Sequence, residues 1–329
     1  MKKLLAGVAV AILALAGCSS GSDATGGHIK MADAGWDSIQ LHNAIVGFVA
    51  ENAYDMTWEE VPGSTPITYE GTKNGEIDIY TEVWTDNLPT YAADKEAGLI
   101  LELSVNFGDN TQGIYVPTYV IEGDAERGIE PMAPNLRTVE DLKDYPDVFV
   151  DDDNPSMGRL YGAIPGWAID DIMRNKFDYY GFDENFIYFS PGSDAALSAA
   201  FTSAYDRGEA IVGYYWEPTW LMGLYDFTLL DDAPYVDQAS FEAGMTEAPS
   251  VPVTVGARPG FTDDFPEFAD FLSNYETSSA LTSQGLAYMQ ETGASTSEAA
   301  IWFISENSDL ISSMMPQDKW ELVEAALGQ

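Results

Sequence analysis

Short β-strand patterns alternate with helical patterns along most of this chain, and this alternation constrains the fold more than any other feature. Ile29–Ala34, Met56–Val61 and Ile77–Trp84 predict strands, and Ser38–Asn52 places its apolar residues on one helical face. Strands that alternate with helices are typical of an α/β fold with mainly parallel sheets. The length of 329 residues suits about two domains.

A second block of the same kind runs from about residue 118 to 249. Thr138 and Asp141 predict a capped helix start, Leu160–Ile164 predicts a strand, and Asp194–Arg207 predicts an alanine-rich helix. A last strand is expected at Val251–Val255, and only helical patterns follow it.

Two sheet regions followed by a return of the chain predict two α/β lobes with two crossovers, near Tyr115–Tyr119 and near Pro249–Val253. We expect residues 28–117 plus 251–329 to form lobe 1, and residues 118–250 to form lobe 2. Chains of this kind hold a ligand in the cleft and close about the hinge.

The N-terminus has the pattern of a lipoprotein signal peptide. Lys2 and Lys3 precede an apolar run, Leu4–Leu15, that is too short to span a bilayer. The run Leu15-Ala16-Gly17-Cys18 resembles the bacterial lipobox, which is cut before a cysteine that is then lipidated. We therefore expect a signal peptide at 1–17, a flexible tether at 18–27, and a body held outside the cytoplasm by a lipid on Cys18. The alternative is a soluble secretory signal with a stray cysteine.

Charge excludes one class of function. The chain has 14 Lys and Arg against 54 Asp and Glu, a formal net charge of −40. A surface this acidic repels phosphate backbones, which argues against nucleic-acid binding, and it does not adsorb to anionic lipid through charge. The acidity favours solubility and suggests salty surroundings, where self-repulsion is screened. Because Cys18 is the single cysteine, disulfides, thiolate nucleophiles and cysteine-ligated metals are excluded together.

Catalytic and metal-binding motifs are missing. His28 and His42 make neither a triad nor a zinc site, and His42 is expected to be a buried helix residue. The acidic run 151–154 lacks the glycine and glutamate of a calcium-binding EF-hand, since Ser156 and Gly162 stand in their places, and we interpret it as a solvated loop. We expect no enzyme, no cofactor and no metal.

The informative residues are tryptophans next to predicted strand ends. Trp36, Trp84, Trp167 and Trp216 each follow or end a predicted strand, two in each predicted lobe. Ligands of open α/β sheets bind beyond the carboxyl ends of the strands, so the four side chains are expected to converge on one cleft. The remaining tryptophans considered, Trp58, Trp302 and Trp320, lie within strand or helix patterns and are expected in the core.

Tryptophan faces in a desolvated cleft suit a quaternary ammonium, which has no N–H group to donate. Each cation–π contact is worth about 0.5–2 kcal/mol, so four would supply about 2–8 kcal/mol, against about 8 for micromolar binding. A carboxylate on the ligand would need donors, and the backbone N–H groups of Gly166 and Trp167 open a predicted helix suited to an anion.

Four motifs follow one another in a specific order and spacing: Asp33-Ala34-Gly35-Trp36, the run Lys73-Asn74-Gly75-Glu76-Ile77-Asp78-Ile79-Tyr80 leading to Trp84, Pro165-Gly166-Trp167, and Trp216-Glu217-Pro218. In these motifs the chain resembles, over about 29–307, the substrate-binding proteins of glycine betaine/choline-type ABC transporters, the OpuAC-like family.

The resemblance implies a two-lobed type II periplasmic-binding-protein fold, no catalysis, and an aromatic cage for a trimethylammonium group. The four tryptophans match cage positions of family members, and Tyr115 matches the tyrosine of choline-type members. Two positions depart from the family: Thr219 replaces the histidine of a Trp-x-Pro-His motif, and Ser38 replaces an aspartate two residues after the first cage tryptophan. Betaine, carnitine, proline betaine, trimethylamine N-oxide and a sulfonium analogue therefore all remain open.

The leading hypothesis is a lipid-anchored receptor that binds a quaternary ammonium compatible solute of the glycine betaine class between two lobes. It would deliver the solute to an ABC permease, its protein partner. The expected ligand-binding residues are Trp36, Trp84, Tyr115, Gly166, Trp167, Trp216 and Thr219. The alternatives are the same fold with a different small solute, such as choline, carnitine, trimethylamine N-oxide, an amino acid or a sulfonate, and a surface enzyme acting on a small amine or glycan. An amine with N–H groups would need carboxylates, which Asp37 and Glu217 could provide.

Overall fold

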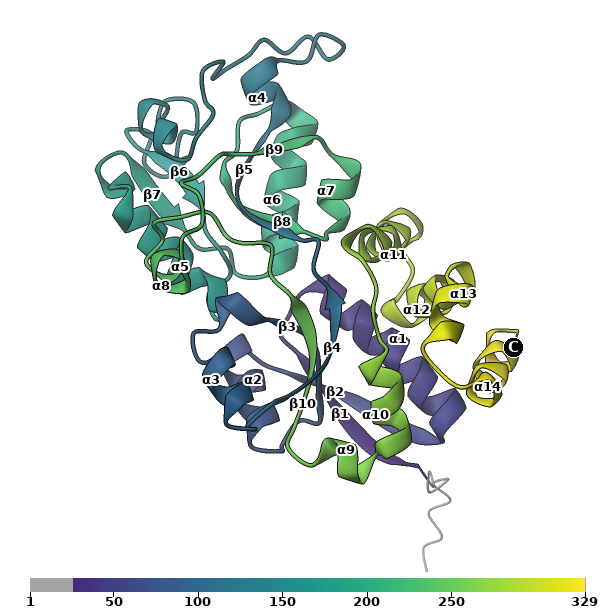
Figure 1. Cartoon of the computed structure of the whole chain (residues 1–329). Coiled ribbons are helices and arrows are strands. Elements are labelled where there is room, and N and C mark those ends of the chain that lie inside the picture. The colour runs from purple at the N-terminus through teal and green to yellow at the C-terminus, as the bar shows by residue number, and fades with distance from the viewer. Residues whose placement is uncertain (1–25, 329) are drawn as a thin grey trace, which may run out of the picture.

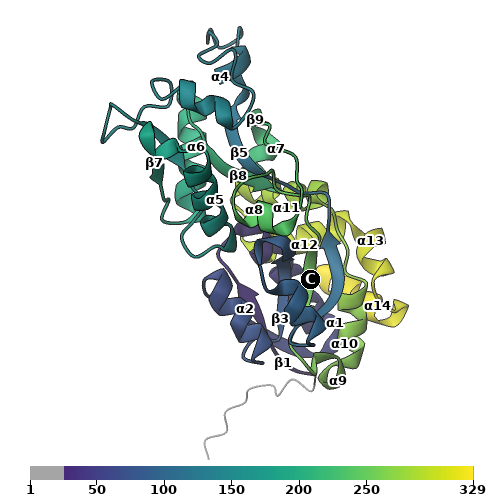
Figure 2. The same ribbon diagram turned by 60° about the vertical axis from the view of Figure 1, so that its left-hand side comes forward.

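Two separate five-stranded sheets, each with helices packed around it, make up the two lobes of the protein (Figure 1). The structure is a computed structural model, and it describes residues 26–328. The expected signal peptide, lipidated Cys18 and most of the expected tether lie outside the described residues. Seen from the side in Figure 2, the two lobes stack end to end, and the C-terminal helices lie against the lobe that also holds the first strand.

The first sheet has the order β2-β1-β3-β10-β4. Its strands are β1 (Gly27–Asp33), β2 (Met56–Pro62), β3 (Ile79–Trp84), β4 (Leu101–Phe107) and β10 (Val253–Ala257). β1 runs parallel to β2 and β3, and β10 runs antiparallel to β3 and β4. All six residues of β3 are buried, as expected of a central strand covered on both faces.

Helices from both ends of the chain cover the first sheet. The N-terminal ones are α1 (Asp37–Tyr54), α2 (Thr65–Lys73), the 3₁₀ turn η1 (Thr85–Asn87) and α3 (Tyr91–Glu96). The C-terminal ones are α9 (Phe261–Asp264), α10 (Pro266–Ser273), α11 (Ser279–Thr292), α12 (Thr296–Glu306), α13 (Ser308–Ser313) and α14 (Gln317–Leu327). α1 packs on α12 and α14, so the two ends of the chain share one core. None of the helices described in residues 26–328 combines the length and the apolar character that crossing a membrane requires.

The second sheet has the order β7-β6-β8-β5-β9. Its strands are β5 (Thr111–Pro117), β6 (Gly158–Tyr161), β7 (Phe186–Phe189), β8 (Gly213–Glu217) and β9 (Phe227–Leu229). The accompanying helices and turns are α4 (Thr118–Glu122), η2 (Glu140–Asp144), α5 (Ala168–Tyr179), η3 (Phe182–Glu184), α6 (Asp194–Arg207), α7 (Trp220–Leu224) and α8 (Gln238–Glu242). α6 has the bounds predicted from the sequence.

The first crossover lies earlier than expected. β5 pairs with β8 and β9, so Tyr115 belongs to the second sheet and the chain passes between the lobes at 108–110. The reason is that Thr111–Pro117 continues as a strand rather than as a linker. Asn110 joins this crossover to the second one, because its side chain accepts from the Val251 N–H at 3.2 Å and donates to the Val251 carbonyl. Side-by-side connections of this kind form a hinge.

Two local predictions need correction. Thr138 and Asp141 do cap each other, with the Thr138 N–H 2.8 Å from the Asp141 carboxylate, but they open the short 3₁₀ turn η2 instead of an α-helix. The acidic run at 151–154 is solvated only in part. Asp151 is buried, accepts two backbone N–H groups and pairs with Arg159, which together hold the pKa of its carboxyl below the usual value. The solvated-loop interpretation was therefore wrong for this residue.

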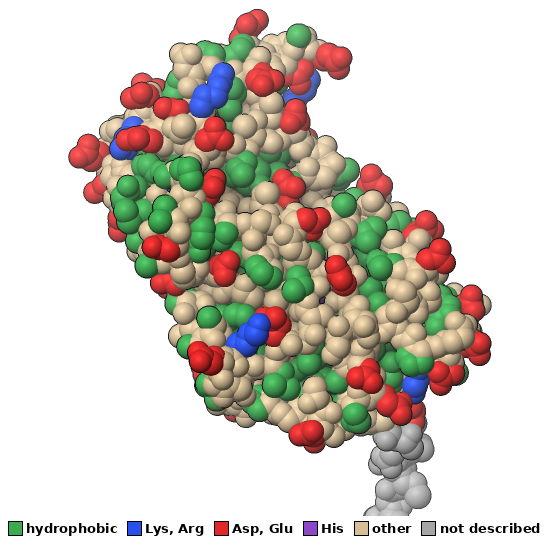
Figure 3. All heavy atoms as spheres, in the orientation of Figure 1, with side chains coloured by type: hydrophobic (Ala, Val, Ile, Leu, Met, Phe, Trp, Pro, Cys, Tyr) green, Lys and Arg blue, Asp and Glu red, His purple; other side chains and the backbone are tan. Residues whose placement is uncertain are grey.

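Acidic side chains are spread over both lobes on the face shown in Figure 3, with few Lys or Arg side chains among them. This distribution agrees with a charge that keeps the surface hydrated and the chain soluble. The expectation of salty surroundings stays a prediction.

Candidate functional site between the lobes

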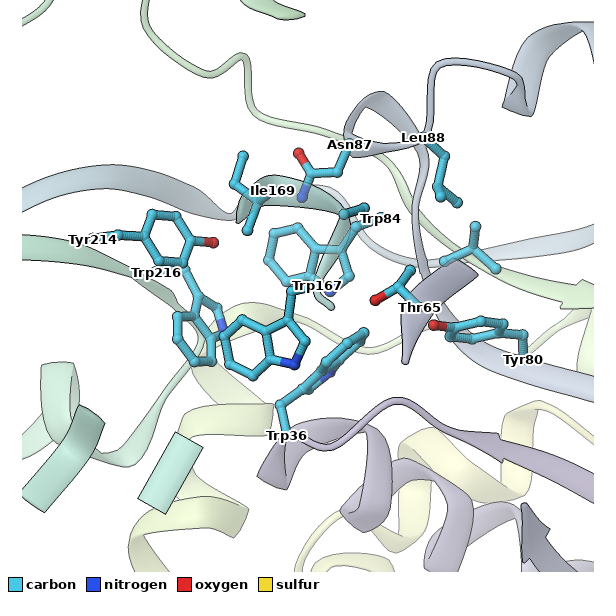
Figure 4. Close-up of a pocket in the computed structure, with 12 residues that line it drawn as sticks. Trp36, Thr65, Tyr80, Trp84, Asn87, Leu88, Trp167, Ile169, Tyr214 and Trp216 are labelled. Carbon is cyan, nitrogen blue, oxygen red and sulfur yellow. The ribbon is translucent and has the colours of Figure 1, made fainter. Parts of the chain in front are cut away.

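The structure brings the four tryptophans singled out in the sequence together between the lobes (Figure 4). Trp36 precedes α1, just after β1, and Trp84 is the last residue of β3. These two strands are parallel neighbours, so their carboxyl ends meet at one edge of the first sheet. From the other lobe, Trp167 precedes α5 and Trp216 lies inside β8, one residue before its end rather than after it. We call these four residues the tryptophan cluster.

Three rings of the tryptophan cluster meet edge to face. The Trp36 and Trp167 ring centroids are 5.7 Å apart with planes at 87°, and those of Trp167 and Trp216 are 5.0 Å apart at 89°. Perpendicular rings suit the quadrupoles of the π-systems. All four side chains are at most 9% exposed. The site is therefore desolvated, which strengthens any electrostatic contact made within it.

A cavity lies among these rings, with about 440 Å³ of empty space including its opening to solvent. Sequence reasoning missed the other side chains around it, which include Thr65, Tyr80, Asn87, Leu88, Ile169 and Tyr214. Only Tyr214 carried a signal, because it stands two residues before Trp216 and so shares its face of β8.

Gly166 and two other expected ligand residues, Tyr115 and Thr219, do not line this cavity. On β5, Tyr115 is three residues after Gln112, so the two side chains point to opposite faces of the sheet. The Tyr115 hydroxyl contacts that of Thr111 at 2.8 Å. Thr219 caps α7, and its hydroxyl accepts from the Met222 N–H at 3.3 Å. Neither residue is part of the site that we propose below.

The lobes touch directly across the cavity. Trp167 Nε1 donates to the Ala34 carbonyl of the first lobe at 3.1 Å, and the Thr65 N–H donates to the Gly166 carbonyl at 2.9 Å. Gly166 has a φ of +99°, and a Cβ at this position would lie 3.1 Å from Cβ of Ser64. Glycine is needed here because both the backbone conformation and the close approach of the lobes disfavour a side chain.

An amide pair and a backbone contact add to this bridge. Asn87 and Gln112 exchange two side-chain hydrogen bonds, at 3.1 and 3.3 Å, and Tyr214 donates to the same Gln112 carbonyl oxygen at 3.1 Å. Gln238 Nε2 donates to the Asp86 carbonyl at 2.6 Å. The described structure therefore represents a closed arrangement of the lobes.

Polar groups without partners face the cavity at one side. The buried Thr65 hydroxyl lies beside the hydroxyl of Tyr80 and interacts with it, but it makes no well-formed hydrogen bond among the described residues. At the start of α5, the Trp167 N–H is already used by the Ile164 carbonyl, whereas the N–H groups of Ala168 and Ile169 make no hydrogen bond within residues 26–328. The N–H groups left without a partner at this helix start are thus those of Ala168 and Ile169, two residues further along than the Gly166 and Trp167 pair named from the sequence. A helix N-terminus with free N–H groups favours a carboxylate.

A buried carboxylate stands behind two of the tryptophans. Glu82 of β3 is fully buried, and one of its oxygens accepts from Trp36 Nε1 at 2.7 Å, from Ser38 Oγ at 3.0 Å and from Trp84 Nε1 at 3.4 Å. Burial raises the pKa of Glu82 to about 7, although these three donors oppose the rise. Ser38 is therefore turned toward Glu82. The sequence signal for Glu82 was one acidic residue within an otherwise apolar strand.

A second, smaller hollow next to Trp216 contains two more carboxylates. Asp37 is the first residue of α1 in the first lobe, and Asp194 is the first residue of α6 in the second lobe. Burial and the neighbouring charge of Asp37 raise the pKa of Asp194 to about 7, and the Asp37 backbone N–H partly offsets the rise. Glu217, by contrast, is exposed and faces Thr111 and Tyr115. Among the described residues, no group of three or more His, Cys, Asp or Glu side chains is placed to hold a metal ion.

Comparisons with known proteins agree with this arrangement. The family model described as the substrate-binding domain of an ABC-type glycine betaine transport system, OpuAC, matches residues 27–306. No protein with curated function matches the sequence.

Three solved structures are similar in fold. The chain is 20% identical to a glycine betaine, L-proline ABC transporter binding protein (ProX) from Borrelia burgdorferi, with a TM-score of 0.71 over 90% of this chain and 99% of that one. It is 20% identical to an ABC-transporter choline-binding protein in complex with choline, with a TM-score of 0.69 over 92% and 98%. It is 17% identical to lactococcal OpuAC in its closed conformation with glycine betaine, with a TM-score of 0.67 over 88% and 99%. The predicted two-lobed periplasmic-binding-protein fold is confirmed.

Proposed function

Since the chain belongs to the family of substrate-binding domains of ABC-type glycine betaine transport systems, we propose that it binds a quaternary ammonium compatible solute of the glycine betaine class between its lobes. Delivery to an ABC permease and attachment to the membrane through a lipid on Cys18 are parts of the same proposal. The family serves transport outside the cytoplasm and is not a family of enzymes.

The observation that carries the proposal is the tryptophan cluster in a buried cavity. A trimethylammonium group offers no N–H donor, so a protein holds it through ring faces rather than through paired carboxylates. Asp37 and Glu217, the carboxylates that an amine with N–H groups would need, lie outside this cavity. A trimethylated solute is therefore favoured over an unmethylated amino acid.

Hydrogen-bond donors in the cavity offer a binding position for the carboxylate end of the ligand. Thr65 Oγ1 and the N–H groups of Ala168 and Ile169 face the same cavity as the rings. A carboxylate would satisfy them better than a hydroxyl, because it accepts several hydrogen bonds and the start of α5 favours a negative charge. This supports glycine betaine over choline as the preferred ligand.

The test is a calorimetric titration of residues 26–329 with glycine betaine, choline, carnitine, trimethylamine N-oxide and glycine, in matched salt. We expect saturable binding of glycine betaine with the highest affinity, and none of glycine. Tighter binding of choline would shift the proposal to the choline alternative. Binding of glycine as tight as that of glycine betaine would overturn it.

Replacing Thr65 with valine is expected to weaken glycine betaine binding about threefold to tenfold, since one net hydrogen bond of about 0.5–1.5 kcal/mol is lost. Binding of tetramethylammonium, which has no polar end, should stay unchanged. Thr72→Val is the matched control, because the buried Thr72 hydroxyl donates to the Thr68 carbonyl of its own helix at 2.9 Å and Thr72 does not line the cavity. Equal weakening of both ligands by Thr65→Val would contradict a contact with the carboxylate.

Asp194→Asn is expected to change the pH dependence of binding. Burial and the charge of Asp37, which belongs to the other lobe, raise the pKa of Asp194 to about 7. We expect opening of the lobes to separate the two carboxylates and return this pKa toward its usual value, so that closing takes up a proton and ligand affinity falls as the pH rises from about 4 to about 7. The variant carries no charge to bury, so it should bind at least about tenfold more tightly than the wild type at pH 7. Titrations from pH 4.5 to 8 measure this, with exposed Asp183→Asn as the control. A constant ratio of the two affinities over that range would contradict the effect.

A further inference from the structure

Glu82 has a position that neither the family match nor the binding proposal explains. It is a fully buried acidic side chain with no Lys or Arg within ion-pair distance among the described residues. Such a charge is costly to bury unless something compensates it. Its second oxygen has no hydrogen-bond partner, and that oxygen lies 3.6 Å from Nε2 of His42.

The groups around Glu82 do not supply a positive charge. Burial lowers the pKa of His42 to about 3, so its ring is neutral, and it contacts the hydroxyls of Tyr275 at 2.7 Å and Thr282 at 3.1 Å. Burial also keeps the hydroxyls of Tyr275 and Tyr80 neutral by raising the pKa of each above its usual value, and the Glu82 charge adds to both rises. The remaining neighbours, Trp36, Trp84 and Ser38, donate hydrogen bonds but carry no charge.

The cavity lies on the other side of the Trp36 and Trp84 indole rings from Glu82. Trp36 and Trp84 both line it, while their Nε1 atoms converge on one oxygen of Glu82. All the residues that contact Glu82 come from the first lobe, so no contact from the second lobe is needed to hold its carboxylate. A carboxylate that accepts an indole N–H raises the electron density of the ring, which strengthens its attraction for a cation.

We propose that Glu82 is the counter-charge of the bound cation, a specificity-determining residue that makes the site prefer a permanently positive head group over a neutral one of the same shape. It acts through Trp36 and Trp84 and does not touch the ligand, so it is a positioning residue. This inference rests on the proposed function. A cation in the cavity favours the ionised form of Glu82, so binding of the cation expels a proton wherever the empty site is still protonated.

The sign of the pH effect follows from this coupling. In the empty protein the pKa of Glu82 is about 7, and a bound cation lowers it. Affinity for a cation is therefore highest above pH 7. It declines as the pH falls from 7 through the lower pKa that Glu82 has in the ligand-bound protein. Asp37 and Asp194 titrate with closure instead, so they affect a charged and a neutral ligand alike.

The experiment compares glycine betaine with 3,3-dimethylbutanoate, in which carbon replaces the positive nitrogen. The readout is the ratio of their dissociation constants, measured by calorimetry from pH 5.5 to 8.5 on residues 26–329 of the wild type and of Glu82→Gln. Taking this ratio cancels the contribution of closure. The glutamine still accepts the two indole N–H groups through its amide oxygen, and thermal unfolding checks that the variant is folded.

We expect the wild-type preference for glycine betaine to grow about tenfold between pH 5.5 and 8, one unit of pKa shift being a factor of ten. In Glu82→Gln the preference for glycine betaine over 3,3-dimethylbutanoate should be independent of pH. It should be close to the preference that the wild type shows at pH 5.5. A pH-independent wild-type ratio, or an unchanged ratio in Glu82→Gln, would overturn the inference alone. A wild type that binds neither glycine betaine, choline nor tetramethylammonium would overturn the proposed function, and the inference with it.

Discussion

Replacing Trp167 with alanine should weaken glycine betaine binding by about a hundredfold. Trp167 is the ring at the centre of the cluster, since it packs against both Trp36 and Trp216. Its loss removes a cation–π contact of about 0.5–2 kcal/mol and the hydrogen bond to the Ala34 carbonyl, worth about 0.5–1.5 kcal/mol, together with packing between the lobes. About 2.7 kcal/mol corresponds to a hundredfold change in the dissociation constant.

Trp167→Phe separates the two contributions. It keeps an aromatic face but loses the indole N–H, so we expect about tenfold weaker binding. Trp302→Ala is the matched control, because Trp302 stacks on Tyr288 in the C-terminal helices and does not line the cavity. Isothermal titration calorimetry measures the dissociation constant of glycine betaine for all three variants. If Trp167→Ala bound glycine betaine within about threefold of the wild type, the tryptophan cluster would not be the ligand site.

Replacing Lys176 with methionine should lower the free energy of unfolding by about 3–5 kcal/mol. Lys176 lies near the end of α5 and is 3% exposed; its Nζ pairs with Asp232 and donates to the Thr246 carbonyl at 2.9 Å. Without the amine, the Asp232 carboxylate stays buried with only the Tyr180 hydroxyl and one backbone N–H. Leaving one partner of a buried ion pair uncompensated is what makes the loss large.

The melting temperature, followed by circular dichroism, should fall by about 10 °C, since 1 kcal/mol corresponds to about 2–4 °C in a chain of this size. The double variant Lys176→Met with Asp232→Asn should recover part of the loss, because no charge is then left buried. Lys30→Met serves as the control, since Lys30 and Glu59 form an exposed pair worth about 0–1 kcal/mol. A Lys176→Met protein that melts like the control would show that the ion pair does not hold α5 in place.

Most secondary-structure elements could be predicted because their signals are local. The helix at Asp194–Arg207 was predicted residue for residue, and its Ser193 cap is visible in the sequence. Strand ends were less exact: Leu160–Ile164 was expected where β6 spans Gly158–Tyr161, since apolar runs continue past the last hydrogen-bonded pair. The position of the first crossover was missed because only pairing with β8 and β9 assigns Thr111–Pro117 to the second sheet.

The candidate site also has one part that local sequence signals predict and another part that depends on tertiary contacts. Large aromatic residues at strand ends mark a ligand site in the sequence, because exposed rings of that size are costly unless something covers them. Tyr115 illustrates the limit, since a strand turns alternate side chains to opposite faces and its neighbours in register decide which face is the cavity. Thr65 and Ile169 line the cavity only because α2 and α5, from different lobes, approach each other there.

By itself, the sequence determined the α/β class, the family and the four tryptophans, because periodicity, spacing and residue type are properties of the chain that need no knowledge of its neighbours. Only the tertiary structure decided which side chains line the cavity, that Asp37 and Asp194 from different lobes lie together, and that Glu82 receives the indole N–H groups of Trp36 and Trp84. The physical reason is that hydrogen bonds, burial and shifted pKa values arise between groups far apart in the chain, and they exist only once packing has excluded water from around them.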